Sequence, residues 1–312
     1  MTRPNTVLGM PPAQSRRLRT ARDRAFGRVV SADIADKSLH VWLPPDIASV
    51  DDRRPVIYAW DGQSLFAGGT SMSGDTWELD AALGRLARAG VRMPIVVGIE
   101  SPARRRAEYM PPEGLAAVPE LVDVFTEHNG APHADEFCDL VVSTIKPVID
   151  ASYPTLTDRE NTFAIGSSMG GLFSLYAMSR HPDVFGAVAC LSLHWVVTGL
   201  PLVSVMANAL PDPATHRLYA DHGTLTLDAR YLDKQPVFDR LAREHGWRDD
   251  DNYLSLVFEG TKHSERDWAA RVCVPLTFLL VDTRAAAGIA AAFGGAPTPR
   301  EIPDELLRPV KL

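Results

Sequence analysis

The sequence predicts an α/β fold, with a mostly parallel sheet and helices on both of its faces. Short apolar runs bounded by turn residues alternate with longer helical patterns along the 312 residues, which is typical of strands joined by crossover helices. Runs such as 55–60 and 95–99 are apolar throughout, as expected for strands buried on both faces. The chain is 46% hydrophobic and 23% charged, so it can bury a large core and is neither disordered nor fibrous.

The expected strands and helices alternate along most of the chain. Residues 38–43 alternate between apolar and polar and end at Pro44 and Pro45, which predicts an early antiparallel strand. Apolar runs predict six further strands, over residues 55–60, 95–99, 162–165, 186–191, 217–220 and 254–258. Helical periodicity predicts helices over residues 76–89, 134–152, 169–180, 236–245 and 265–285.

We expect one α/β domain over residues 26–284, preceded by an N-terminal arm over 1–25 and followed by a C-terminal tail over 285–312. Residues 101–132 are rich in proline and acidic side chains and lack clear periodicity. A loop of that length in a compact domain is often functional. The basic run at 104–106 is interpreted as solvated surface.

Composition limits the partners and the compartment. A net charge of −7 argues against nucleic acid, because the chain supplies no net counter-charge to phosphates. The first 24 residues lack the apolar core of a signal peptide, and no stretch reaches the roughly 18 to 20 apolar residues of a membrane span. Cys138, Cys190 and Cys273 are far apart, which indicates neither a disulfide framework nor a thiolate metal site. We expect a reduced, soluble, cytoplasmic protein that binds neither nucleic acid nor membrane; the sequence indicates no oligomeric state.

The sharpest motif is Gly166-Ser167-Ser168-Met169-Gly170, which fits G-x-S-x-G between a predicted strand and a predicted helix. A serine on such a tight turn has a strained backbone, so Gly166 and Gly170 are expected to tolerate almost no side chain. The turn would expose the Ser168 hydroxyl and leave the Met169 N–H free to stabilise an oxyanion. Ser168 is therefore the predicted nucleophile, with Met169 in the oxyanion hole.

A serine nucleophile needs a base and an acid, and with this turn they follow it as Asp or Glu, then His. His263 follows the predicted strand at 254–258 after a short turn. A loop that leaves this strand would place the histidine above the carboxyl edge of the sheet. Asp221 and Asp228 both follow the strand at 217–220. The sequence alone does not decide which of the two aspartates is the acid of the triad. We favour Asp228 for its reach and expect Asp221 to brace the strand end.

The strand-to-helix turn at Gly166–Gly170 is called the elbow below. Further motifs occur in order before and after it, at residues 56–66, 77–80, 96–99, 106–109, 221–224 and 263–268. In these pieces, between about residues 38 and 280, the chain resembles the esterase D-like branch of the α/β hydrolases, which includes enterochelin esterases, feruloyl esterase domains and mycolyl-transferases. The resemblance implies an α/β-hydrolase fold, a second oxyanion N–H at Gln63, an acid at Asp228 and a base at His263. It implies no metal and no organic cofactor.

These residues predict a serine esterase that acts on a small-molecule ester through an acyl-enzyme on Ser168. A siderophore or aromatic ester is the substrate class that the resemblance suggests. The alternatives are an acyltransferase or thioesterase that uses the same triad in a biosynthetic pathway, and a non-catalytic binding protein on the same fold. Five residues are candidates either for the substrate pocket or for core packing: Trp60, Trp77, Tyr109, His194 and Trp195.

Overall fold

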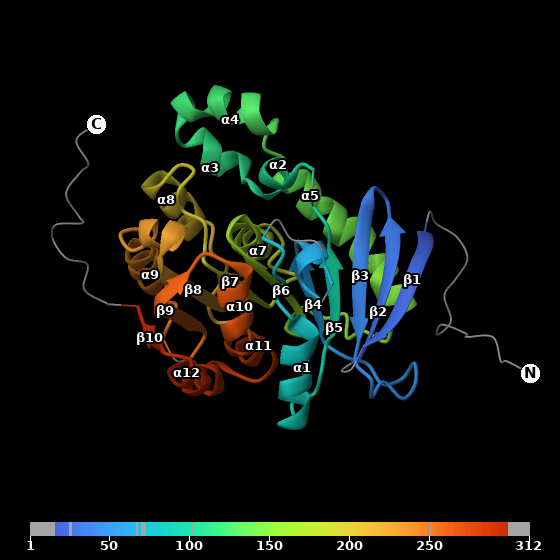
Figure 1. Cartoon of the computed structure of the whole chain (residues 1–312). Coiled ribbons are helices and arrows are strands. Elements are labelled where there is room, and N and C mark those ends of the chain that lie inside the picture. The colour runs from blue at the N-terminus through green and yellow to red at the C-terminus, as the bar shows by residue number, and fades with distance from the viewer. Residues whose placement is uncertain are drawn as a thin grey trace, which may run out of the picture.

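The computed structural model describes residues 16–24, 27–66, 68–69, 73–101, 103–249 and 251–298. These residues form a ten-stranded sheet with the strand order β1-β2-β3-β5-β4-β6-β7-β8-β9-β10 (Figure 1). Its strands are β1 (Arg16–Arg24), β2 (Gly27–Ile34), β3 (Lys37–Leu43), β4 (Val56–Trp60), β5 (Ile95–Ile99), β6 (Thr162–Ser167), β7 (Ala187–Leu191), β8 (Arg217–Leu225), β9 (Tyr253–Lys262) and β10 (Gly295–Pro297).

The central strands of the sheet are parallel and its edges are antiparallel. From β5 through β4, β6, β7 and β8 to β9, every neighbouring pair runs in parallel. The hairpin strands β1, β2 and β3 form one antiparallel edge, and β10 forms the other. This arrangement confirms the predicted fold class, including the antiparallel direction of the strand at 38–43.

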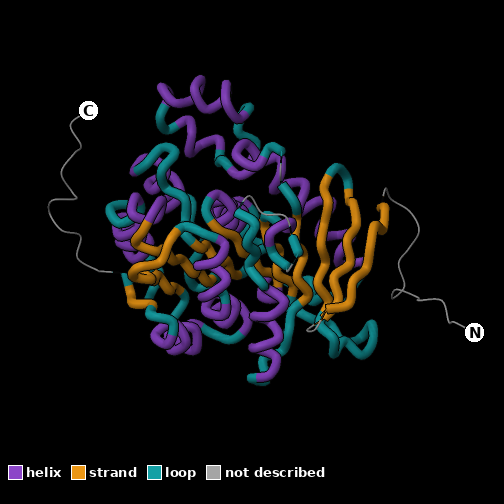
Figure 2. Tube along the Cα trace, viewed as in Figure 1, coloured by secondary structure: helices purple, strands orange, loops and turns teal. Residues whose placement is uncertain are grey.

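Helices cover both faces of the sheet (Figure 2). They are α1 (Leu79–Arg88), α2 (Arg105–Tyr109), α3 (Pro112–Ala116), α4 (Val122–Asn129), α5 (Ala134–Leu140), α6 (Lys146–Ser152), α7 (Met169–Arg180), α8 (Leu200–Asn208), α9 (Gln235–Glu244), α10 (Glu265–Arg271), α11 (Cys273–Leu280) and α12 (Thr283–Ala292). Among the described residues, no helix is both long and apolar enough to cross a membrane.

Alternation along the strands divides the apolar side chains into two cores. On β4, Tyr58 and Trp60 belong to the core that includes side chains of α5, α7 and α9. Ile57 and Ala59 belong to the opposite core, with side chains of α1, α11 and α12. Both faces of β4 are therefore buried, which explains why its sequence is apolar throughout.

Two predicted helices are divided in the structure. The helix predicted over 134–152 contains a π-helical turn at Val141–Ile145, just before Pro147, which has no N–H to donate to the preceding turn. The helix predicted over 265–285 is three helices, α10, α11 and α12. The last begins at a new cap, because the Asp282 side chain accepts a hydrogen bond from the Ala285 N–H at 2.7 Å.

Several elements were not predicted. Residues 101–132 contain α2, α3 and α4, which Figure 1 places together at one end of the sheet. Helix α8 was also missed. Strand β1 lies in the segment assigned to the arm, while most of α12 and all of β10 lie in the segment assigned to the tail. The ends of the arm and tail, 1–15 and 299–312, lie outside the described residues.

Candidate active site

Ser168 lies on the turn between β6 and α7. Its backbone has φ 56° and ψ −126°, a conformation that residues with a side chain rarely adopt. The Ser168 N–H donates to Leu191 O at 2.9 Å, which fixes the turn against the end of β7. Met169 is the first residue of α7, so its N–H has no acceptor within the helix. The positive end of α7 therefore begins beside the Ser168 hydroxyl.

The two glycines of the turn have different amounts of space. A Cβ on Gly166 would lie 2.5 Å from Gly170 O and 2.6 Å from Trp60 Cδ1, so this position excludes any side chain. A Cβ on Gly170 would lie 3.4 Å from Trp60 Cβ, which is an ordinary contact. The expectation that both positions need glycine is therefore correct for Gly166 and wrong for Gly170.

Asp228 and His263 come together from the loops that follow β8 and β9. The His263 Nδ1–H donates to Asp228 Oδ1 at 2.5 Å. The other carboxylate oxygen accepts from Ser192 Oγ and from the Gly223 N–H, both at 2.7 Å. Burial opposes ionisation of Asp228, but the hydrogen bonds from His263, Gly223 and Ser192 outweigh it and hold the pKa of the carboxyl below its usual value. The ionised carboxylate thus fixes the imidazole with its Nε2 free.

Asp221 has a different partner. The Arg271 Nε donates to Asp221 Oδ2 at 3.1 Å, and Arg271 Nη2 donates to Oδ1 at 2.9 Å. The Tyr219 hydroxyl and the Ser192 N–H complete its hydrogen bonds, at 2.7 and 3.2 Å. Asp221 lies within β8 rather than at its end, and it joins this strand to Arg271 at the end of α10. This is a structural role, as expected for the acid that does not face the histidine.

A second histidine lies beside the serine. Ser168 Oγ is 3.4 Å from His194 Nδ1, and the Tyr231 hydroxyl is 3.0 Å from the same nitrogen. Burial, together with the positive charge of His263, lowers the pKa of His194 to about 3. His194 is therefore neutral at ordinary pH and makes no ion pair with a carboxylate among the described residues. Of these two histidines, His263 is the one paired with an anion that can stabilise an imidazolium.

The turn after β4 contains Gln63, the predicted second oxyanion donor. Residues Gly62–Ser64 form a 3-10 turn that begins after Asp61, and Gln63 lies within it. A Cβ on Gly170 would lie 3.5 Å from Asp61 Oδ2, so this turn lies against the first turn of α7, which begins at Met169. The structure thus brings the backbones of Gln63 and Met169 to the same edge of the sheet.

Four of the five candidate pocket residues are buried in the two cores. They are Trp60, Trp77, Tyr109 and Trp195, which are 1%, 2%, 0% and 0% exposed. The Trp60 Nε1–H donates to Ser174 Oγ and the Trp195 Nε1–H to Gln235 Oε1, each at 2.8 Å. These four have the environment of core packing, the alternative that the sequence left open. His194 alone of the five contacts Ser168.

Sequence reasoning missed the polar partners of the site. Tyr231 lies in the same loop as Asp228, three residues later, but tyrosine in a loop has no distinctive pattern. Ser192 follows β7 and bonds Asp228 only because the sheet brings β7 and β8 together. Arg105 was interpreted as solvated surface, and this is wrong, because its guanidinium forms an ion pair with Asp61 at 2.7 Å.

No cluster of three or more His, Cys, Asp or Glu side chains that could hold a metal ion occurs in the described part of the chain. The three cysteines, Cys138, Cys190 and Cys273, are free and buried. Burial raises the pKa of the Cys138 and Cys190 thiols well above its usual value, so neither is an activated nucleophile.

A family model described as Putative esterase matches residues 35–276. The chain belongs to this esterase family. It is therefore a hydrolase that acts on esters.

Relatives in sequence include siderophore esterases. An uncharacterized protein of Bacillus subtilis, YbbA, is 23% identical over 72% of this chain and 84% of its own length. Ferri-bacillibactin esterase BesA of B. subtilis is 29% identical over 54% of this chain and 58% of its own length. A siderophore triacetylfusarinine C esterase of Aspergillus fumigatus is 30% identical over 42% of this chain and 41% of its own length. The chain thus spans most of YbbA and about half of the other two.

Solved structures of esterases share the fold. A ferulic acid esterase superimposes with a TM-score of 0.60 at 17% identity, over 82% of this chain and 98% of the esterase. The BES protein from Bacillus cereus superimposes with a TM-score of 0.58 at 16% identity, over 87% of this chain and 98% of that protein. The esterase-family chain therefore has the α/β-hydrolase fold, as predicted.

Proposed function

We propose that the protein is a serine hydrolase that cleaves a carboxylic ester through an acyl-enzyme on Ser168. Two observations carry the proposal: the strained turn at Ser168, and the hydrogen bond between His263 and Asp228 on the loops after β9 and β8. Ser168 Oγ attacks the ester carbonyl while His263 Nε2 takes its proton and passes it to the leaving alcohol. Asp228 stays ionised and stabilises the imidazolium. Water then repeats the cycle and releases the acid.

The oxyanion of each tetrahedral intermediate is bound by the N–H groups of Met169 and Gln63. One such donor is worth about 3 to 4 kcal/mol of transition-state stabilisation in comparable sites. The positive end of α7 adds to this, because the helix begins at Met169. No metal ion is needed for these steps.

The substrate we propose is an ester of a catecholate siderophore or of an aromatic acid, with a negative charge on a group other than the ester itself. Two relatives are named as siderophore esterases. Burial is the main cause of the low pKa of His194, and the positive charges of Arg105, Arg106 and Arg230 add to it. The same three charges favour an anion beside Ser168. Arg106 and Arg230 are exposed and make no ion pair among the described residues. They are therefore free to meet an anionic group.

A pair of serine variants tests the mechanism. Ser168→Ala should abolish hydrolysis of p-nitrophenyl esters, a siderophore lactone and a feruloyl ester, and should abolish labelling by a fluorophosphonate probe. Ser167→Ala is the matched control, because it removes the neighbouring hydroxyl, and it should keep the labelling. Labelling that persists in Ser168→Ala, or that maps to Ser167, would overturn the proposal.

The same assay separates hydrolysis from acyl transfer. A sugar or other alcohol acceptor is added to the wild-type protein with an activated ester, and both the free acid and the new ester are measured. We expect the free acid to dominate. A new ester formed in preference to the acid would make the protein an acyltransferase with the same triad.

A further inference from the structure

Helix α2 contacts the turn that carries Gln63 through two of its side chains. Arg105 Nε and Nη2 donate to the two carboxylate oxygens of Asp61, each at 2.7 Å. One helical turn later, the Tyr109 hydroxyl accepts the Asp61 N–H at 3.1 Å. Arg105 Nη2 also lies 3.5 Å from Ser167 O, in the residue before the proposed nucleophile. One guanidinium therefore joins α2, the Asp61 turn and the elbow.

Asp61 has an uncommon backbone conformation. Its φ of 58° and ψ of 48° are left-handed, which is disfavoured for a residue that carries a side chain. The next residue, Gly62, packs on the end of β5, where a Cβ would lie 2.6 Å from Gly98 C. Gln63 follows immediately. The position of the Gln63 N–H is therefore set by where Asp61 is held.

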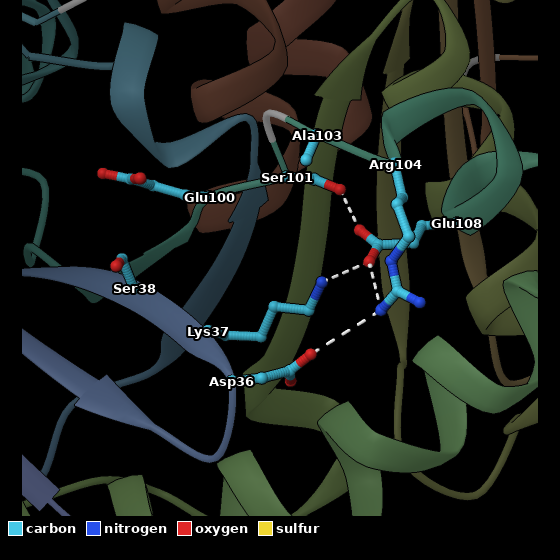
Figure 3. A pocket seen from close by; sticks show the side chains of 8 residues that line it. All are labelled: Asp36, Lys37, Ser38, Glu100, Ser101, Ala103, Arg104 and Glu108. Carbon is cyan, nitrogen blue, oxygen red and sulfur yellow. Dashed lines mark hydrogen bonds and ion pairs between the residues drawn. The ribbon is translucent and has the colours of Figure 1, made fainter. Parts of the chain in front are cut away.

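Glu108, the residue before Tyr109, fixes α2 to the β2–β3 hairpin and to the segment that follows β5. The Glu108 carboxylate accepts hydrogen bonds from Lys37 Nζ and Ser101 Oγ (Figure 3). The Lys37 and Glu108 side chains are 8% and 3% exposed, and both line a cavity of about 200 Å³. The charges around this cavity are already paired. Arg104 Nη2 lies 3.6 Å from both Asp36 Oδ2 and Glu108 Oε1, and Glu100 pairs with His40. These paired side chains therefore hold α2 in place, and we assign no ligand to the cavity.

We propose that α2 positions the oxyanion turn, with Arg105 as a positioning residue that acts through Asp61 on the Gln63 N–H. This inference rests on the proposed function. An oxyanion donor acts only when it lies about 2.7–3.1 Å from the developing charge, so a displaced turn weakens transition-state binding more than substrate binding. The donors of Arg105 that contact Asp61 and Ser167 are directed at protein acceptors rather than at a substrate.

Arginine variants with a matched control test this role. Arg105→Ala should lower kcat by about 10²- to 10³-fold, the loss typical of a missing oxyanion donor, while KM changes by less than about threefold. Arg105→Lys keeps the charge but loses the fork of parallel hydrogen bonds, so it should also lower kcat. Arg180→Ala is the control, because Arg180 makes the same two-pronged ion pair with Asp139, at 3.0 and 2.9 Å, away from the site. It should keep kcat.

A double variant shows whether Arg105 acts through Asp61. Arg105→Ala/Asp61→Asn should lose no more kcat than the worse single variant, since both changes break one interaction. Guanidinium ion added to Arg105→Ala should restore part of kcat. If Arg105→Ala fails to fold in a thermal melt, Arg105→Lys, Asp61→Asn and their combination provide the same comparison.

Two results would overturn the inference. One is a double variant that loses the product of the two single losses. The other is an Arg105→Ala protein whose KM rises while kcat is unchanged, which would assign Arg105 to substrate binding. Failure of the proposed function gives a different pattern, because Ser168→Ala would then retain the ester hydrolysis seen in the wild type.

Discussion

Arg271 and Asp221 form a two-pronged ion pair in the interior of the protein, where the Arg271 side chain is 2% exposed and the Asp221 side chain 0%. Asp228, seven residues after Asp221, instead accepts the Nδ1–H of His263. Ser192 joins the two acids, because its N–H donates to Asp221 and its hydroxyl to Asp228. Asp221, within β8, and Asp228, in the turn after it, therefore support different parts of the structure.

Substitution of each acid by asparagine should separate catalysis from stability. Asp228→Asn should keep the fold and depress kcat by a large factor, about 10⁴ in the best-studied triad. Asp221→Asn should leave the buried Arg271 charge unpaired and lower the free energy of unfolding by about 3 to 5 kcal/mol. Measurements of kcat and denaturant unfolding for both variants make the comparison. Lost catalysis at unchanged stability in Asp221→Asn, with near-normal activity in Asp228→Asn, would transfer the role of the acid to Asp221.

The sequence predicts the parts of the site that depend on local geometry. The turn at Ser168 can be recognised because the position of Gly166 admits no Cβ. The glycine and the serine lie two residues apart, so the requirement is visible as a local sequence motif. The Asp61–Arg105 pair could not be predicted in this way, since 44 residues separate its members and only the fold brings them together. The same holds for Asp221 and Arg271, which are 50 residues apart.

The aromatic residues show a further reason why sequence falls short. Trp60, Trp195 and His194 were all pocket candidates because they lie near the ends of predicted strands. The two tryptophans are nevertheless buried in the core, where their indole N–H groups donate hydrogen bonds. The hydropathy pattern does not indicate which residues near the end of a strand face the nucleophile and which face the core. The short edge strand β10 was missed because its three residues, Gly295–Pro297, have no alternation from which a strand could be predicted.

The two histidines near Ser168 should have different effects on the pH profile. The kcat/KM of the wild type should rise with pH in one step, because the general base must be unprotonated to accept the proton of Ser168. His194, whose pKa lies at about 3, is already neutral above that value and adds no step. His194→Gln should keep the wild-type step and change kcat/KM by about two- to tenfold, the worth of one neutral hydrogen bond.

His263→Gln is the comparison for that profile. It should remove the pH step and cost about as much activity as Ser168→Ala, since members of a triad act as a unit. The double variant Ser168→Ala/His263→Gln should be no worse than either single variant. If His194→Gln abolished the step while His263→Gln retained it, His194 would be the base.

Alanine at the two glycines of the elbow should have unequal effects on stability. Gly166→Ala places a Cβ 2.5 Å from the carbonyl oxygen of Gly170, a backbone atom that cannot rotate away, so the free energy of unfolding should fall by about 1 to 3 kcal/mol. Gly170→Ala makes only an ordinary contact at 3.4 Å and lies in a helix, where alanine is favoured over glycine by up to about 1 kcal/mol. Its stability should be unchanged or slightly raised. Denaturant unfolding of both variants measures the difference, and equal losses at the two positions would show that the turn is not packed in this way.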